Sequence, residues 1–180
     1  MRAPIETARL RLECLGPALL RALLAHDYAS ASLLLGAHVP LEMASLDEVF
    51  ALRLSQLREA PAHEPWLTRA MVHAADRVVV GVAGFHGPPG GEWLEDYAPG
   101  AAEFGYTVLE RYQRRGYAAE AGAALVAWGL AHGADRFVLS IGPENAVSLR
   151  LAEKLGFERA GQWMHETRGL EYVYVRDERR

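Results

Sequence analysis

The most informative segment of this sequence is Gln113-Arg114-Arg115-Gly116-Tyr117-Ala118. It follows an apolar, strand-like run over residues 104–109 and opens a helix-like run over residues 117–131. A turn that feeds a helix leaves backbone N–H groups without acceptors at the positive end of the helix dipole, which favours an anion there. Gly116 has no Cβ, so it can adopt φ > 0 and let a ligand approach the main chain. The two arginines of the stretch add charge suited to phosphates, so the sequence predicts a phosphate-binding turn.

Hydrophobic periodicity along the rest of the chain predicts a mixed α/β sheet with helices on both faces. Strands are predicted over residues 8–14, 66–72, 77–85, 102–109, 137–141, 162–167 and 171–176, and helices over residues 17–36, 45–58, 117–131 and between Asn145 and Gly156. Residues 87–100 are interpreted as an irregular loop.

Single residues mark the ends and the packing of these elements. Ser45 followed by Glu48 is typical of a capping box, and Gly133 and Gly156 are typical of helix C-caps. Gly105 inside a strand indicates a bulge or a close backbone approach. The last helix is predicted to bury an apolar face made of Val147, Leu151 and Leu155.

Length and composition predict one domain, over residues 1–180, with a sizeable core. The net charge of -4 argues against a nucleic-acid partner, because such proteins usually present a basic face. No apolar run approaches the length of a membrane span and the N-terminus lacks a signal-peptide pattern, so we expect a cytoplasmic protein without a membrane partner. Cys14 is the only cysteine, which excludes an internal disulfide.

Two other site types are disfavoured by residue counts. Lys154 is the only lysine and lies ahead of a cap glycine, so a nucleotide-phosphate enzyme with a P-loop lysine is not expected. The histidines are scattered and form no His-x-x-x-His or His-x-His pair, so no metal site is expected.

Three segments together carry a family resemblance. The spacing Gln-x-x-Gly-x-Ala at residues 113–118 resembles the acyl-CoA pyrophosphate loop of the GNAT superfamily, the acyl-CoA-dependent N-acyltransferases. Residues 145–157 resemble the second cofactor-contacting helix of that family and its Gly-Phe exit, and residues 6–12 resemble the first strand of its RimJ/RimL-type branch, which acetylates ribosomal-protein N-termini. The resemblance covers nearly the whole chain. It implies the GNAT fold, with a mostly antiparallel central sheet and an acyl-CoA cleft between the central strands.

The resemblance also implies acetyl-CoA as cosubstrate and no metal. The turn would hold the pyrophosphate, the main chain before it would pair with the pantetheine arm, and Asn145 would contact the same arm. The cofactor-binding residues carried over in this way are Tyr106, Thr107, Val108, Leu109, Arg114, Arg115, Gly116, Ala118, Ala119 and Asn145. Two simpler interpretations stay open, namely that the turn at residues 113–118 is an ordinary strand-to-helix turn and that Asn145 only caps its helix.

Two catalytic residues follow from the same resemblance. Glu103, on the same strand face as Gly105, is the candidate general base, with a surface pair to an arginine as the alternative. Ser148 is the candidate acid that protonates the departing thiolate, with a plain helix-terminus role as the alternative. Many family members use a tyrosine four residues later for that task, and this chain has Ala152 there.

The expected activity is transfer of an acetyl group to a primary amine, either a protein N-terminal α-amine or a small amine, by direct attack in a ternary complex. The alternative is a non-catalytic acyl-CoA-binding module, which only Ala152 favours. A homodimer is expected because the resembled branch often forms dimers. Candidate acceptor-side residues, which could equally be core or dimer contacts, are His38, Glu42, Trp66, Trp93, Trp163 and His165.

Overall fold

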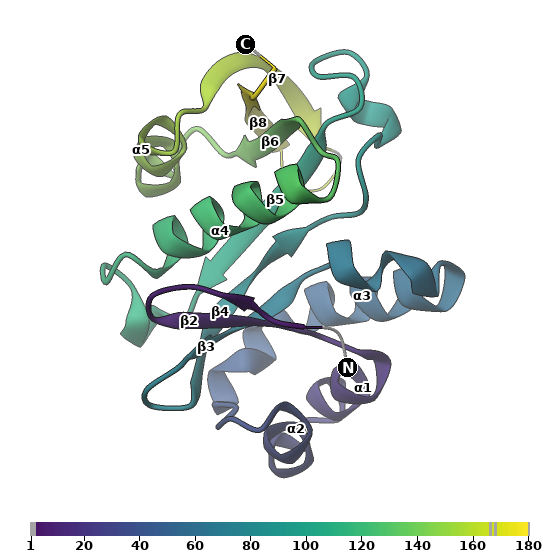
Figure 1. Ribbon diagram of the computed structural model, residues 1–180, viewed down its shortest axis with the longest axis vertical. Helices are drawn as coiled ribbons and strands as arrows, with labels where there is room; N and C mark the ends of the chain where they lie inside the picture. Colours follow the sequence, from purple (N-terminus) through teal and green to yellow (C-terminus); the bar gives the residue numbers. More distant parts are fainter. Residues whose placement is uncertain (1–2, 166, 168, 180) are drawn as a thin grey trace. The chain divides into compact units, whose positions relative to one another are not determined.

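The computed structural model describes residues 3–165, 167 and 169–179, and Figure 1 shows the chain. Contacts between residues divide the chain into two compact units, Met1–Gly84 with Tyr106–Ala124 and Phe85–Gly105 with Leu125–Arg180. Each unit is assembled from two separate stretches of sequence. One domain over residues 1–180 therefore stays a prediction, and the units are described one at a time.

The elements alternate along the chain much as the periodicity indicates. The helices are α1 (Pro17–Leu24), α2 (Tyr28–Leu35), α3 (Asp47–Glu59), α4 (Tyr117–Ala131) and α5 (Ala146–Lys154), with short 3-10 helices η1 (Leu41–Leu46), η2 (Pro61–Trp66), η3 (Glu92–Leu94) and η4 (Glu110–Tyr112). The strands are β1 (Ile5–Glu6), β2 (Leu10–Cys14), β3 (Arg69–His73), β4 (Val78–Phe85), β5 (Ala102–Val108), β6 (Arg136–Ile141), β7 (Glu158–His165) and β8 (Gly169–Asp177).

The first unit is a sheet with helices on both faces. Its strands follow the order β1-β2-β3-β4, and every neighbouring pair is antiparallel. Ala70 and Val72 on one face of β3 pack into a core with leucines of α1 and α3, the helices drawn beside these strands in Figure 1. On the opposite face His73 meets the ring of Tyr117, the first residue of α4, at a centroid distance of 5.7 Å.

The second unit follows the order β5-β6-β8-β7, in which β5 and β6 are parallel and the other pairs antiparallel. Phe104 on one face packs against Phe85 and against Phe157, which follows α5. The other face has its own apolar cluster, in which Trp93 stacks on Trp163 with the ring centroids 4.7 Å apart. The predicted mixed, mostly antiparallel α/β fold is confirmed.

The region from residue 17 to residue 66 differs most from prediction. The helix predicted over residues 17–36 is two helices, because His26 adopts φ 54° and the Asp27 side chain accepts a hydrogen bond from the Ser30 N–H, which caps α2. The capping box at Ser45 is also wrong. Ser45 lies in η1 and donates to the Glu42 carbonyl at 2.8 Å, and α3 begins after Leu46 without a side-chain cap.

Smaller differences concern element ends. The strand predicted over residues 66–72 begins at Arg69, because η2 occupies the residues before it, and the short strand β1 was not predicted. Strands β7 and β8 are longer than the strands predicted over residues 162–167 and 171–176. Residue 166 of the first of these predictions lies outside the described residues. The apolar face predicted for the last helix is wrong at Val147, which is 69% exposed, whereas Ala152 is fully buried.

Two further predictions concern the glycines that cap helices and the absence of a membrane span. Gly133 and Gly156 adopt φ of 91° and 80°, in the left-handed region expected of helix C-caps. None of the helices within the described residues is long and apolar enough to cross a membrane.

Gly129 offers a test of the packing of α4 in the second unit. A Cβ at this position would lie 2.5 Å from Cε1 of Phe137 and 3.2 Å from Cζ of Phe85. We therefore expect Gly129→Ala to destabilise the fold by about 1–3 kcal/mol through overpacking, although alanine is the better helix former. Thermal unfolding should show a Tm lower by roughly 2–12 °C. Ala127→Gly, at an exposed position of the same helix, should cost no more than about 1 kcal/mol. A Gly129→Ala protein more stable than the wild type would contradict the packing described.

Candidate active site

The turn before α4 has the backbone geometry of an anion site. After η4 the chain extends at Gln113, whose side-chain amide donates to the Val108 carbonyl at 3.0 Å. Arg114 and Gly116 then adopt φ of 61° and 82°. Left-handed residues turn neighbouring N–H groups into a concave arrangement that suits an anion. Gly116 adopts this conformation without steric cost because it has no Cβ, whereas Arg114 is one of the uncommon non-glycine residues that adopt it.

The turn and the first turn of α4 expose a run of backbone donors. Among the described residues, none accepts a hydrogen bond from the backbone N–H groups of residues 114–119. The positive end of the dipole of the 15-residue helix α4 lies at the same place. Arg114 and Arg115 are both exposed beside these donors. Arg114, Arg115, Gly116, Ala118 and Ala119, predicted from the sequence as pyrophosphate-binding, all belong to this segment.

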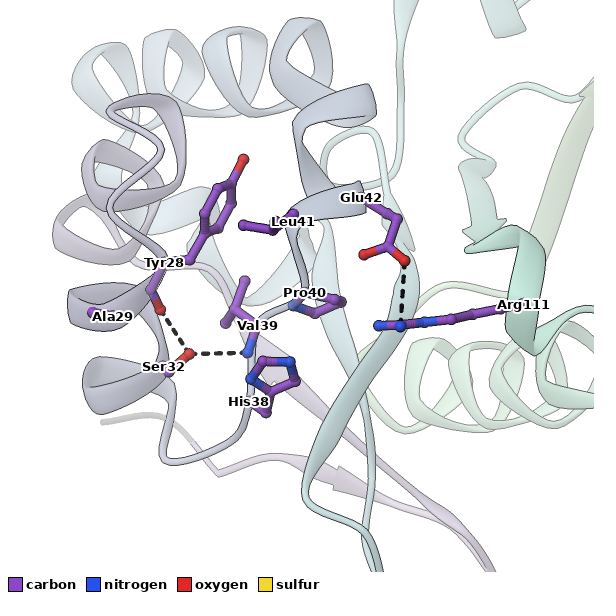
Figure 2. Close-up of a pocket in the computed structure, with 9 residues that line it drawn as sticks. All are labelled: Tyr28, Ala29, Ser32, His38, Val39, Pro40, Leu41, Glu42 and Arg111. Atoms are coloured by element: carbon purple, nitrogen blue, oxygen red, sulfur yellow. Dashed lines mark hydrogen bonds and ion pairs between the residues drawn. The ribbon is translucent and has the colours of Figure 1, made fainter.

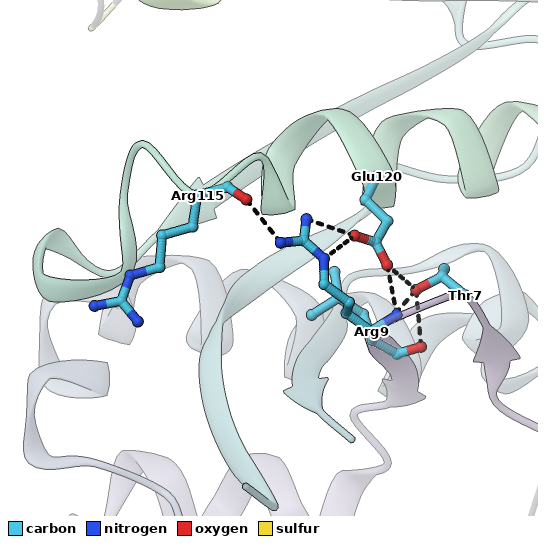
Figure 3. Close-up of polar contacts among 5 residues, drawn as sticks. Thr7, Arg9, Arg115 and Glu120 are labelled. Carbon is cyan, nitrogen blue, oxygen red and sulfur yellow. Dashed lines mark hydrogen bonds and ion pairs between the residues drawn. The ribbon is translucent and has the colours of Figure 1, made fainter. Parts of the chain in front are cut away.

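Figure 3 shows a polar network that links Thr7 and Arg9, from the N-terminal part of the chain, with Arg115 and Glu120. Arg9 donates to the Arg115 carbonyl at 2.9 Å and pairs with the Glu120 carboxylate at 2.7 Å. The same carboxylate accepts hydrogen bonds from the Thr7 hydroxyl at 2.6 Å and from the Arg9 backbone N–H at 2.7 Å. Burial raises the pKa of Glu120, but these bonds and the charge of Arg9 outweigh it, so the pKa lies below its ordinary value.

A cavity of about 790 Å³ in the first unit adjoins the predicted pantetheine-binding main chain. Thr107, Val108 and Leu109 at the end of β5 line it, together with Gln113 of the turn. Residues of η1, among them Glu42, complete the lining. Three of the four residues predicted to pair with the pantetheine arm therefore border one cavity, while Tyr106 does not line it.

A second cavity in the same unit, of about 600 Å³, is drawn in Figure 2. Tyr28, His38 and Leu41 line it, and it shares two residues with the first cavity, namely Glu42 and Arg111. These two form an ion pair at 3.3 Å in which each side chain is about half exposed. Of the candidate acceptor-side residues, His38 and Glu42 thus border a cavity.

The pairing of β5 with β6 stops early in the second unit. Within the described residues it consists of Ala102 opposite Phe137 and Glu103 opposite Val138, although β6 continues to Ile141. Phe104 and Gly105, which follow in the same unit, have no ladder partner on β6 among the described residues. Glu103 lies at the last paired position.

Glu103 is a buried carboxylate with a histidine partner that the sequence did not suggest. Its side chain is 8% exposed, and Oε2 lies 2.9 Å from Nδ1 of His86. The His86 backbone N–H donates to the Glu103 carbonyl at 2.9 Å, so the two residues face each other across neighbouring chain segments. A Cβ on Gly105 would lie 3.1 Å from Nε2 of His86. The close approach predicted at Gly105 is therefore to a side chain.

The start of α5 has a capped N-terminus. The Asn145 side chain accepts a hydrogen bond from the Ser148 N–H at 3.1 Å, which satisfies one donor of the first turn. Asn145 is exposed and Ser148 half-buried. Asn145, Ser148 and Glu103 all belong to the second unit, whereas the residues of the turn belong to the first.

Three other candidate acceptor-side residues lie in or against an apolar cluster. Trp93 and Trp163 pack in the apolar cluster of the second unit, and the His165 ring lies edge-on to Trp163 at 5.6 Å. Over the described part of the chain, no three His, Cys, Asp or Glu side chains are placed to hold a metal ion.

Comparisons with known proteins identify the fold and the family. The chain resembles several solved structures, one of which, from Bordetella pertussis, is assigned to the GNAT-family acetyltransferases. That protein is 25% identical, with a TM-score of 0.67 over 97% of this chain and 99% of its own. At 13% identity, the ribosomal-protein-S5-alanine acetyltransferase of Vibrio fischeri shares the fold, with a TM-score of 0.65 over 98% of this chain and 97% of its own.

A third structure contains coenzyme A. It is the ribosomal L7/L12 α-N-protein acetyltransferase RimL, 17% identical, with a TM-score of 0.61 over 97% of this chain and 96% of its own. No curated protein matches the chain at a significant level. The sequence model of the GNAT acetyltransferase domain matches residues 9–158, a span that includes the turn, Glu103 and all of α5. This protein is therefore a member of the GNAT acetyltransferase family.

Proposed function

We propose that this protein transfers an acetyl group from acetyl-CoA to a primary amine, by direct attack of the amine on the thioester in a ternary complex. The observation that carries the proposal is the run of free N–H groups at residues 114–119, beside two exposed arginines and next to a cavity bordered by the end of β5. Phosphates bind such helix starts, and RimL and the microcin self-immunity protein MccE have been seen with CoA and acetyl-CoA respectively.

In the proposed complex the pyrophosphate lies on the N–H groups of the turn, with Arg114 and Arg115 supplying charge. The pantetheine arm lies along Thr107, Val108 and Leu109, whose main chain borders the cavity. Tyr106 and Asn145 are proposed to contact the same arm nearer its thiol end. The cavity supports this placement, because an extended arm needs open space beside the main chain with which it pairs.

The chemical step needs a neutral amine. The amine nitrogen attacks the thioester carbon, the carbon–sulfur bond breaks, the amine loses a proton and the sulfur leaves as a thiolate. We propose that Glu103 takes that proton directly or through a water, with His86 orienting its carboxylate. Ser148 is proposed to donate a hydrogen bond or a proton to the departing sulfur.

The acceptor is proposed to be an amine of low pKa, such as a peptide N-terminus. An α-amino group has a pKa of about 7.7–8.0, so it costs roughly 1 kcal/mol to neutralise at pH 7, against roughly 4.6 kcal/mol for a lysine side chain. Three ribosomal-protein acetyltransferases among the similar structures favour the same class. Small amines are the second class, and a homodimer stays a prediction.

Acetyl-CoA binding is tested by thermal stability. At about a hundred times its Kd, acetyl-CoA should stabilise the fold by about 2.7 kcal/mol, a Tm rise of roughly 5–11 °C for a chain of this size. Gly116→Glu should abolish the rise, because it adds bulk and negative charge where the phosphates are proposed to bind. Gly133→Glu is the matched control, since Gly133 has a similar positive φ and open space at the other end of α4. A wild-type protein indifferent to saturating acetyl-CoA and CoA would refute the proposal.

Glu103 is tested by its pH dependence. Glu103→Gln should lower kcat/KM by about 10²–10⁴, the usual effect of losing a general base. The loss should shrink as the pH rises above the pKa of the acceptor, because solvent then supplies the neutral amine. Glu171→Gln, which changes another buried carboxylate in the second unit, should keep the wild-type profile. An active Glu103→Gln enzyme with an unchanged pH profile would remove Glu103 from the mechanism.

Ser148 should contribute less than Glu103. Ser148→Ala removes one hydrogen bond to a thiolate that is already a good leaving group, so kcat should fall by about tenfold with acetyl-CoA binding unchanged. The backbone N–H that Asn145 caps is kept in this variant, so α5 should retain its start. Steady-state thiol release with the best amine of a panel would measure the effect. Release of thiol by neither wild type nor variant, with acetyl-CoA still bound, would favour the acyl-CoA-binding module.

A further inference from the structure

The network around Arg9 and Glu120 joins the chain just before β2 to the start of α4 (Figure 3). The Arg9 guanidinium serves two partners at once, since Nη1 donates to the Arg115 carbonyl and Nε and Nη2 to Glu120. It also lies 4.7 Å from the centre of the Tyr117 ring. Its position is thus fixed by a carboxylate, a carbonyl and an aromatic face, although the side chain is 43% exposed.

The bond to the Arg115 carbonyl has a geometric consequence. A trans peptide is planar, so its C=O and the following N–H point in opposite directions. By holding the Arg115 carbonyl, Arg9 fixes the direction of the Gly116 N–H, one of the donors without an acceptor among the described residues. A Cβ at Gly116 would lie 3.4 Å from Nη2 of Arg9, so the guanidinium packs directly behind the turn.

The pair with Glu120 has an electrostatic consequence. Glu120 lies in the first turn of α4, where an anion must approach if the turn binds phosphate. An uncompensated carboxylate there would repel that anion and occupy the positive end of the dipole. Arg9 neutralises it at 2.7 Å, with further hydrogen bonds from Thr7 and the Arg9 N–H.

We infer that Arg9 is a positioning residue for the pyrophosphate loop: it orients the Gly116 N–H and neutralises Glu120, so that the turn accepts the diphosphate of acetyl-CoA. Arg9 acts through the loop, so it governs the affinity for the nucleotide part of the donor. The inference rests on the proposed function, because the diphosphate is the ligand that the loop is proposed to hold.

The test compares two acetyl donors. Arg9→Gln should raise the KM and the calorimetric Kd for acetyl-CoA by about ten- to a hundredfold, since it removes charged hydrogen bonds and exposes the Glu120 charge. With S-acetyl-pantetheine, which has no diphosphate, kcat/KM should stay within about twofold of the wild-type value. Arg11→Gln is the control, because Arg11 is equally exposed, lies two residues on and pairs with Glu6 and Glu13 rather than with the turn.

Two further variants separate the geometric from the electrostatic effect. Arg9→Lys keeps a charge for Glu120, but a single ammonium group lacks the fork that reaches both partners, so its loss should be smaller than that of Arg9→Gln. In Arg9→Gln/Glu120→Gln the repelling carboxylate is also gone, so part of the affinity for acetyl-CoA should return. Tm is measured for each protein, and the Arg9→Lys variant carries the test if the Arg9→Gln variant does not fold.

The outcomes are distinguishable from a failure of the proposed function. A wild-type protein that neither binds CoA nor uses acetyl-CoA would end the proposed function. A wild-type enzyme that is active, with Arg9→Gln unchanged toward acetyl-CoA, would end only the inference about Arg9. Equal losses with both donors would also overturn it, because Arg9 would then support the fold in general.

Discussion

The backbone N–H groups at the start of α4 are the constraint around which the rest of the site is built. A helix leaves its first N–H groups without acceptors, and the left-handed residues Arg114 and Gly116 extend that run backwards into the turn. N–H groups without an acceptor in the protein form hydrogen bonds with water or with an anion. The neighbouring side chains agree with an anion, since the arginines are exposed and Glu120 is paired with Arg9.

β5 brings two different chemical roles onto one strand. At its start Glu103 is paired with β6 and buried beside His86, where it is the proposed general base. At its end the residues from Thr107 to Leu109 border a cavity, the proposed place of the pantetheine arm.

Short sequence patterns predicted those parts of the structure that depend on a few neighbouring residues. The turn before α4, the strand before it and the cap glycines Gly133 and Gly156 were readable because glycine conformation and hydrophobic period act over a few residues. His86 was missed, because its role depends on the register between two segments joined by a long loop. The break at Asp27 was missed because apolar residues continue on both sides of it. The Arg9–Glu120 pair joins residues far apart in the sequence, and no local pattern marks such a pair.

The buried Ala152 links the packing of α5 to the choice of mechanism. Its side chain is fully buried, so a tyrosine there would need space that the surrounding core already fills. A tyrosine acid at position 152 would therefore require the neighbouring side chains to rearrange. The proposed reaction tolerates the absence of this acid, because a thiol with a reference pKa of about 8.5 leaves readily as a thiolate. In the proposed mechanism the larger demand is for a neutral amine, and it falls on the acceptor's own pKa and on Glu103. A buried carboxylate with a histidine partner, in a chain without that tyrosine, supports the proposal of an amine that is easily deprotonated over that of a lysine side chain.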